Sequence, residues 1–162
     1  MTTNSSVAQA AVVPMRAGRV CLVLSTSGKR WVIPKGRIER RHTAGETALK
    51  EAWEEAGLLG LLRRHPVGSY RYEKCGQDFH VTVFFMNVTE VAESFPEKDR
   101  RVRRWVRIDR MLRYIGDPAL LRLLQRALAP PKPEFAPVRR HGQTGSRRRR
   151  LLISQGAGRN GS

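Results

Sequence analysis

Short apolar runs alternate with turn-forming residues along most of the chain. Residues 8–15 (AQAAVVPM) and 19–26 (RVCLVLST) predict two strands joined by a turn at Ala17-Gly18. Residues 31–34 (WVIP) predict a third, short strand that ends at Pro34-Lys35-Gly36. The pattern therefore predicts that the chain opens with strands.

A long hairpin and one further strand are predicted later in the chain. β-Branched and aromatic residues are frequent in residues 61–74 and 78–90, which flank Cys75-Gly76-Gln77. Residues 100–108 (RRVRRWVRI) predict the last strand. Most of the regular structure is thus expected to be strand.

Two helices are predicted, one in the middle of the chain and one after the last strand. Thr43 followed by Glu46 is a capping-box pattern, and Gly57 ends the run where a left-handed cap belongs. The helix between them is about fourteen residues long on this reading. Residues 117–129 (DPALLRLLQRALA) predict an amphipathic helix that stops before a proline pair. These elements predict an α+β fold over residues 7–129, with helices packed on a mixed sheet.

The first helix is expected to have an apolar side and an acidic side, because successive residues turn by about 100°. The apolar side is predicted to comprise Leu49, Ala52, Trp53 and Ala56. The acidic side is predicted to comprise Glu51, Glu54 and Glu55. Like charges at this spacing destabilise a helix by about 0.2–0.5 kcal/mol per pair, and Lys50 precedes Glu54 by one turn and can orient it.

A divalent cation reverses the sign of this repulsion, and hard oxygen ligands on one face suit Mg²⁺ or Mn²⁺. An ordinary solvated helix surface has the same composition, so the helix alone leaves both interpretations open. The loop before it favours the metal, because Pro34-Lys35-Gly36 closes a strand, frees a backbone carbonyl and brings a lysine near the acids. A glycine-hinged loop beside carboxylates is a plausible seat for a metal-bound diphosphate.

Residues 36–58 resemble the Nudix box, G-x5-E-x7-R-E-U-x-E-E-x-G-U, where U is aliphatic. Gly36 opens the motif, and residues 50–58 (KEAWEEAGL) close it in register. The resemblance covers residues 7–129 and implies a Nudix-type α/β/α sandwich, with a mixed sheet, a catalytic helix and a C-terminal helix. It also implies hydrolysis of a diphosphate linkage by metal-assisted attack of water.

The resemblance implies roles for individual residues. Glu51, Glu55 and the carbonyl of Lys35 would be ligands of Mg²⁺ or Mn²⁺, and Glu54 would be the base that activates water. Two positions depart from the box, because His42 stands where a glutamate is expected and Lys50 where an arginine is expected. The three core acids remain, so we expect activity with a changed metal demand, and we expect His42 to face solvent.

Further segments resemble the Nudix branch that includes diphosphoinositol-polyphosphate and diadenosine-polyphosphate hydrolases. They are PKG before the box, GSYRYEK after it and EKDRRVRRWV beyond. In that branch a polar loop before the third strand contacts substrate phosphates. The candidates here are Ser25, Thr26, Ser27 and Arg30, with Lys35, Arg37, Arg103 and Arg104 as further cations.

Three functional hypotheses follow. The first is a metal-dependent hydrolase of a phosphorylated small molecule such as a dinucleoside polyphosphate or an inositol pyrophosphate. The second is an RNA 5′-end pyrophosphohydrolase, and the third is a catalytically weak Nudix-like ligand-binding module. The intact acid set argues against the third, and the lack of aromatic residues interleaved with the C-terminal arginines argues against the second.

The formal net charge is +17, and it is unevenly distributed. Residues 130–162 hold eight Lys and Arg against one Glu, with many Pro and Gly, which predicts a basic, disordered tail making nonspecific polyanion contacts. The two cysteines are too few for a disulfide framework and lack zinc-site spacing. With no apolar run near the roughly 18 residues of a membrane span and no signal-peptide pattern, we expect a cytoplasmic protein.

Overall fold

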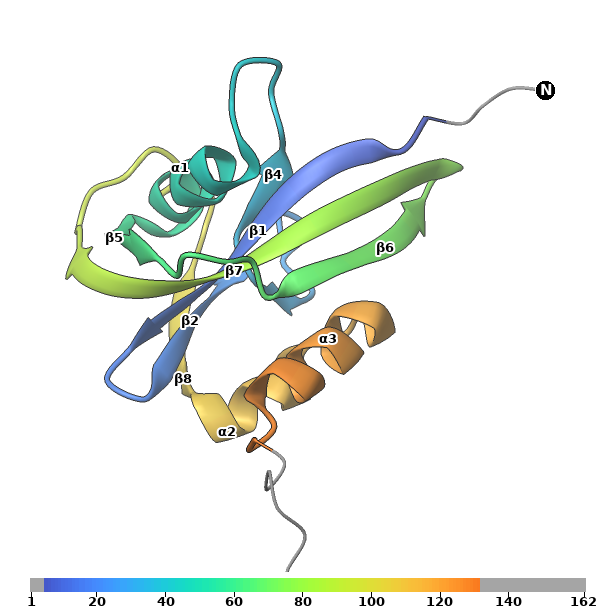
Figure 1. Ribbon diagram of the computed structural model, residues 1–162. Helices are drawn as coiled ribbons and strands as arrows, with labels where there is room; N and C mark the ends of the chain where they lie inside the picture. Colours follow the sequence, from blue (N-terminus) through green and yellow to red (C-terminus); the bar gives the residue numbers. More distant parts are fainter. Residues whose placement is uncertain (1–4, 132–162) are drawn as a thin grey trace, which may run out of the picture. The chain divides into compact units, whose positions relative to one another are not determined.

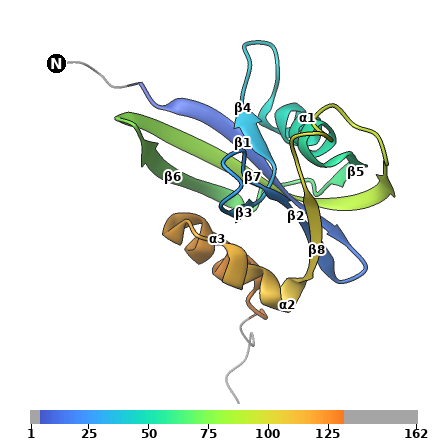
Figure 2. The same cartoon turned by 180° about the vertical axis from the view of Figure 1, so that it is seen from behind.

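The computed structural model describes residues 5–131. Within them one mixed sheet of eight strands is flanked by α1 on one face and α3 on the other (Figures 1 and 2). The elements are β1 (Val7–Arg16), β2 (Arg19–Leu24), β3 (Trp31–Val32), β4 (Lys35–Arg37), α1 (Ala44–Ala56), β5 (Leu58–Leu62), β6 (Gly68–Lys74), β7 (Gln77–Val91), β8 (Arg103–Arg107), α2 (Ile108–Met111), the 3₁₀ helix η1 (Leu112–Tyr114) and α3 (Pro118–Leu128). The predicted α+β class and the sandwich of helices around a mixed sheet are confirmed. The predicted tail lies outside the described residues from position 132 onward.

The sheet is organised around β1. The strand order is β3-β2-β1-β7-β5, while β4 pairs with β1, β6 with β7 and β8 with β2. β1 and β7 are parallel, with Val7 opposite Phe79 and Met15 opposite Asn87. All the other strand pairs in the described part are antiparallel.

Both faces of β1 are covered, which explains its continuous apolar sequence. Ala11 and Val13 belong to a core cluster that includes the leucines of α3. Ala10 and Val12 point to the opposite face and belong to a cluster that includes the alanines of α1. Side chains alternate across a strand, so these four consecutive buried residues contribute to two separate cores.

The ends of α1 form as the sequence predicts. The Thr43 N–H donates to Glu46 Oε2 over 2.7 Å, and the Glu46 N–H donates to Thr43 Oγ1 over 3.2 Å. Gly57 has φ of 63°, a left-handed conformation that glycine adopts readily, and its N–H bonds to the Trp53 carbonyl. The helix is therefore fixed at both ends by local chemistry.

The predicted division of α1 into two sides is wrong at two positions. Leu49 is 37% exposed, whereas Glu55 is only 6% exposed. The strip against the sheet is centred on Ala48, Ala52 and Ala56. Glu55 lies about 60° around the helix from Ala52, so its carboxylate is buried at the border of that strip.

The strand predicted over residues 61–74 is two strands. β5 and β6 both pair with β7, at opposite ends of its fifteen residues. They are separated by a segment that contains Pro66, which has no N–H for a sheet ladder. β4 was not predicted, and it forms where Lys35–Arg37 pairs with residues 9–11 of β1. α2 and η1 were not predicted either.

The predicted hairpin is confirmed in β6 and β7. Cys75 and Gly76 form its two-residue turn, with φ of 51° and 73°. Two positive φ angles match the type I′ turn, whose twist suits a tight hairpin. None of the helices in residues 5–131 has both the length and the apolar character needed to cross a bilayer.

Candidate active site

Four glutamates gather where α1 meets the segment between β7 and β8. Glu51, Glu54 and Glu55 come from α1, and Glu97 comes from the connecting segment. The Glu97 N–H donates to the Glu54 carbonyl over 2.9 Å, which holds this segment on the helix. Burial raises the pKa of Glu51, and the negative charges of Glu54 and Glu97 raise it further. The four carboxylates therefore share one electrostatic environment.

Gly36 on β4 is the contact point between the strand layer and the acids. A Cβ at this position would overlap the Glu51 carboxylate. Glycine is required here because the carboxylate lies directly against the backbone. The first residue of the predicted motif thus fixes the place of one of its acids.

Glu55 is the most buried of the acids on α1. Its Oε1 accepts a hydrogen bond from Arg101 Nη2 over 2.7 Å. Burial raises the pKa of Glu55 to about 8, because desolvation and the charges of Glu51 and Glu97 outweigh Arg101 and a hydrogen bond from the Lys35 backbone. The Lys35 peptide therefore lies beside Glu55, while the role of its carbonyl as a metal ligand stays a prediction.

Arg101 joins the acids to the sheet, and it is not among the site residues predicted from the sequence. Its side chain is 10% exposed. Nε donates to Glu97 Oε2 over 2.8 Å, and Nη1 donates to the Leu24 carbonyl over 3.1 Å. With the bond to Glu55, one guanidinium supplies positive charge to two carboxylates.

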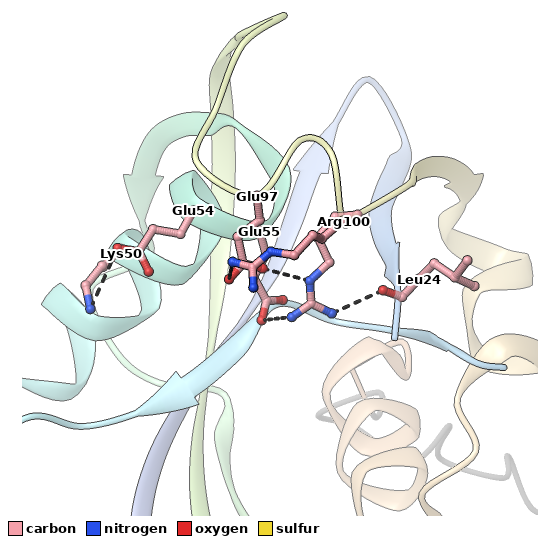
Figure 3. A network of polar contacts seen from close by, with 7 residues as sticks. Leu24, Lys50, Glu54, Glu55, Glu97 and Arg100 are labelled. Carbon is pink, nitrogen blue, oxygen red and sulfur yellow. Dashed lines mark hydrogen bonds and ion pairs between the residues drawn. The ribbon is translucent and has the colours of Figure 1, made fainter. Parts of the chain in front are cut away.

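Lys50 lies between the carboxylates of Glu39 and Glu54, and Figure 3 shows it beside Glu54. Its Nζ is 3.7 Å from Glu54 Oε1 and 3.1 Å from Glu39 Oε1. His42 is exposed, as expected, and its Nδ1 is 3.7 Å from Glu39 Oε2. An acid is therefore present beside Lys50 although position 42 itself is a histidine.

A cleft of about 550 Å³ opens beside Glu55. Eight residues are predicted from the sequence to contact substrate phosphates. Four of them line the cleft: Ser25, Thr26, Arg30 and Lys35. The other lining residues are Gln9, Trp31, Val32, Ile33, Glu55, Tyr70, Tyr72, Glu73, Lys74, Arg101, Ile115, Gly116, Asp117 and Leu120. Ser27, Arg37, Arg103 and Arg104 are not among the lining residues.

The polar loop between β2 and β3 is held in shape by Ser25. Its N–H donates to the Arg30 carbonyl over 2.7 Å, and its hydroxyl accepts from the Arg30 N–H over 3.2 Å. The Ser27 hydroxyl is 3.1 Å from that of Ser25. These bonds place Arg30 at the cleft wall, whereas Ser27 bonds within the loop.

Lys35 and Tyr72 form another part of the cleft wall. Lys35 Nζ lies 4.0 Å from the centre of the Tyr72 ring. Burial lowers the pKa of Lys35 from its ordinary value, with nearby charges acting in both directions. The Tyr72 hydroxyl donates to Gln9 Oε1 over 2.7 Å, and its ring stacks on Phe79. The ammonium group is thus held at a defined place on the wall.

Two of the predicted arginines have other partners. Arg103 Nη1 donates to the carbonyls of Ala56 and Ala92 over 2.7 and 2.8 Å, which ties the end of α1 to the segment after β7. The Arg104 guanidinium lies over the rings of Trp31 and Tyr114, at 5.6 and 5.4 Å from their centres. Their predicted contact with substrate stays a prediction.

The acids suit a hard divalent cation in kind, because carboxylate oxygens are the ligands that Mg²⁺ and Mn²⁺ prefer. Within residues 5–131, however, no three His, Cys, Asp or Glu side chains converge closely enough to enclose an ion. Glu55 and Glu97 instead share Arg101. Chemistry and charge therefore fit such an ion, while the side-chain arrangement is that of an arginine-paired site.

A mixed sheet between helical layers, with a glycine loop set against a carboxylate-bearing helix, defines the Nudix class of fold. The model of the NUDIX domain family matches residues 6–127. The chain belongs to the Nudix family, which confirms the resemblance carried by residues 36–58.

Several characterised and solved proteins are similar to this chain. Nudix hydrolase 12, mitochondrial, of Arabidopsis thaliana is 35% identical over 101 residues, covering 57% of this chain and 50% of that protein. Diphosphoinositol polyphosphate phosphohydrolase 3-beta of Bos taurus is 28% identical over 103 residues, covering 62% of each. The chain spans about half the length of the first of these curated relatives.

Solved structures agree with the fold. The Ap4A hydrolase of C. elegans has a TM-score of 0.62 at 18% identity, covering 75% of this chain and 96% of that one. A NUDIX hydrolase from Nitrosomonas europaea has a TM-score of 0.64 at 17% identity, covering 76% and 88%. Some of the relatives are named as mitochondrial proteins, so the cytoplasmic location stays a prediction.

Proposed function

We propose that the protein is a metal-dependent hydrolase that cleaves a diphosphate linkage in a phosphorylated small molecule. The observation that carries this proposal is the position of Glu55. Its carboxylate belongs to the acid group on α1 and also lines the cleft that holds Arg30 and Lys35. A site for a divalent cation and a site for phosphate anions therefore meet at one side chain.

Glu51, Glu55 and the Lys35 carbonyl would hold Mg²⁺ or Mn²⁺ in this proposal. When bound, the ion neutralises the diphosphate oxygens and lowers the barrier to attack at phosphorus. Gly36 supports this assignment, because its missing side chain leaves the space that the Glu51 carboxylate occupies. The Lys35 backbone also bonds to Glu55, and this proximity supports the proposed role of its carbonyl.

Glu54 is proposed as the general base. Its side chain is 35% exposed, so water reaches it, and Lys50 lies 3.7 Å from its Oε1. Glu54 accepts a proton as the water oxygen forms a bond to phosphorus. The bridging P–O bond breaks, its electrons remain on the departing phosphate, and the cations of the cleft stabilise that anion.

The proposed substrates are dinucleoside polyphosphates and inositol pyrophosphates. Arg30, Lys35 and Lys74 bring positive charge to the cleft, which suits a ligand with several phosphates. A diphosphoinositol polyphosphate phosphohydrolase is among the relatives, and an Ap4A hydrolase shares the fold. Both kinds of substrate contain the phosphoanhydride bond that this chemistry cleaves.

A hydrolysis screen of the purified full-length protein, in which the phosphorylated products are separated by anion-exchange chromatography, tests the proposal. Dinucleoside polyphosphates, inositol pyrophosphates, nucleotide sugars and capped RNA are each offered with Mg²⁺, with Mn²⁺ and with excess chelator. We expect turnover of one of the first two classes that depends on added metal. Turnover of none of the four classes with either metal would contradict the proposal, and turnover of capped RNA alone would replace its substrate class.

A further inference from the structure

We infer that Arg101 is the resident counter-ion of the acidic site, and that a divalent cation binds there in exchange for it. This inference rests on the proposed metal site and adds a competitor within the chain. It assigns Arg101 a positioning role: it holds Glu55 and Glu97 in place without metal and sets how tightly metal binds.

The contacts of Arg101 account for all of its guanidinium nitrogens. Nη2 donates to Glu55 over 2.7 Å, Nε to Glu97 over 2.8 Å and Nη1 to the Leu24 carbonyl over 3.1 Å. The two carboxylates come from different elements, one from α1 and one from the segment after β7. A planar fork matches this arrangement, because its donors point in fixed directions toward both acids at once.

The guanidinium and a metal ion compete for the same oxygens. Mg²⁺ needs ligand oxygens at about 2.0–2.1 Å in near-octahedral order, and Glu55 Oε1 is already bonded to Arg101. Positive charge on the guanidinium also repels a dication in a poorly hydrated site. In the described residues no group of three such side chains converges on one point, and two of the acids are bonded to Arg101.

The exchange requires only side-chain movement. The N–H groups of Arg100 and Arg101 donate to the Glu97 carbonyl over 2.9 Å. The backbone turn that carries Glu97 and Arg101 can therefore stay intact when their side chains separate. The Leu24 carbonyl holds Arg101 independently of the acids. Arg101 also lines the cleft, so the released guanidinium has a polar space to enter.

Without metal, Arg101 prevents a buried carboxylate from being left unpaired, which is costly inside a protein. Removing the guanidinium therefore has two effects of opposite sign. The metal-free protein loses stability, and the metal gains affinity because nothing has to be displaced. A side chain that only supported the fold would lower stability and leave metal affinity unchanged or weaker.

Metal binding to purified full-length variants separates these roles. Arg101→Gln removes the charge and the fork, and Arg101→Lys keeps only the charge. Arg100→Gln is the matched control for charge. The Arg100 side chain is 74% exposed, and its Nη2 lies 3.7 Å from Glu97 Oε1, so the variant loses the same charge from a solvent-exposed ion pair. Arg103→Gln is the control for structural loss, because Arg103 joins α1 to the segment after β7 without contacting an acid in its hydrogen bonds.

The dissociation constant of Mn²⁺ is measured from the electron paramagnetic resonance signal of the free ion, and the melting temperature is measured with chelator. For Arg101→Gln we expect at least tenfold tighter Mn²⁺ binding, a lower melting temperature without metal and a larger rise in melting temperature with it. Arg101→Lys should change in the same direction by less. Arg100→Gln should stay within about twofold of the wild type, and Arg103→Gln should melt lower without tighter binding.

The result that overturns the inference is unchanged or weaker Mn²⁺ binding in both Arg101 variants while the wild type binds Mn²⁺. If Arg101→Gln is unfolded without metal, Arg101→Lys provides the comparison. Absence of Mn²⁺ binding in the wild type and both variants would overturn the metal site and this inference together. Binding that appears only in the variants would support the inference.

Discussion

The two long helices pack on opposite faces of one sheet and contact it with different side chains. α1 meets the sheet through Ala48, Ala52 and Ala56, and it buries the charged Glu55 at the edge of this strip. α3 meets the other face through leucines that are almost fully buried: Leu120, Leu123 and Leu124.

The two helices therefore differ in role: α1 positions the acids, and α3 contributes more to the stability of the fold. Alanines bring the α1 backbone close to the strands, which sets the acids against Gly36 and beside the cleft. They bury little apolar surface, and Glu55 adds a desolvation cost. Each buried leucine of α3 contributes about 1.5–3 kcal/mol. Substitutions on α1 should therefore affect chemistry first, and those on α3 should affect stability first.

The largest effect is expected for Glu54→Gln on α1. We expect kcat to fall about 10²–10⁴-fold, because the variant loses the group that accepts the proton of water. The melting temperature should be close to that of the wild type, since Glu54 is partly exposed. Steady-state kinetics on the best substrate of the screen checks this, with the exposed Glu90→Gln as control. Near-wild-type turnover would assign the base role to another residue.

Leu124→Ala tests the other helix. Leu124 is fully buried, so the truncation should lower the free energy of unfolding by about 2–5 kcal/mol. kcat should be unchanged at temperatures where the variant is folded, because Leu124 does not line the cleft. Urea unfolding and kinetics measure the two quantities, and Gln125→Ala, exposed on the same helix, is the control. A large loss of kcat in the folded variant would mean that α3 also positions the site.

The buried carboxylate of α1 gives the protein a pH dependence that α3 does not share. The pKa of Glu55 is raised from 4.5 to about 8 in the folded protein. Between these pH values the folded state retains a proton that the unfolded state has released. The contribution of Glu55 to the free energy of unfolding is therefore fully present below about pH 4.5 and is lost as the pH rises to about 8. The expected loss is no more than about 1.4 kcal/mol for each unit of the pKa shift, and it is measured in chelator.

Urea unfolding of the wild type and of Glu55→Gln from pH 5 to 8 measures this effect. The variant lacks the titrating group, so the difference between the two proteins isolates Glu55 from other titrations. The stability of the wild type relative to the variant should decrease as the pH rises. A constant difference would mean that Arg101 keeps Glu55 ionised throughout.

The smallest effect is expected where α1 touches β4. Gly36→Ala places a methyl group in the space of the Glu51 carboxylate, so the metal concentration for half activity should rise about tenfold, equivalent to about 1.4 kcal/mol. The control is Gly45→Ala in the first turn of α1, where the new Cβ would meet only the Leu62 side chain, at 3.4 Å. If both variants keep the wild-type metal dependence, the Glu51 carboxylate is not a ligand.

The sequence predicts features that depend on neighbouring residues. The start and end of α1 follow from Thr43, Glu46 and Gly57, whose bonds are local. The hairpin turn at Cys75-Gly76 is equally local. The spacing of Glu51, Glu54 and Glu55 identifies the acidic helix because all three lie within two turns of it.

Features that depend on distant pairing were missed. β4 forms because Lys35–Arg37 pairs with β1, and a segment of three residues is too short to show a strand pattern in the sequence. Glu97 and Arg101 lie in a basic stretch with no periodicity, and they join the site only because their segment folds onto α1. The burial of Glu55 depends on how α1 sits on the sheet, which helical periodicity places only to within one residue position.

The parallel pairing of β1 with β7 also governs when the domain can fold. Residues 7–15 can form their parallel pairing at the centre of the sheet only after residues 79–87 have been synthesised. Contacts this distant in sequence slow folding, because loop closure precedes any gain from the pairing. During synthesis, a chain that ends before β7 exposes an apolar strand on one side, which is a surface for chaperones or for aggregation. The centre of the sheet is thus completed only after synthesis of β7, the longest strand and the seventh of eight in residues 5–131.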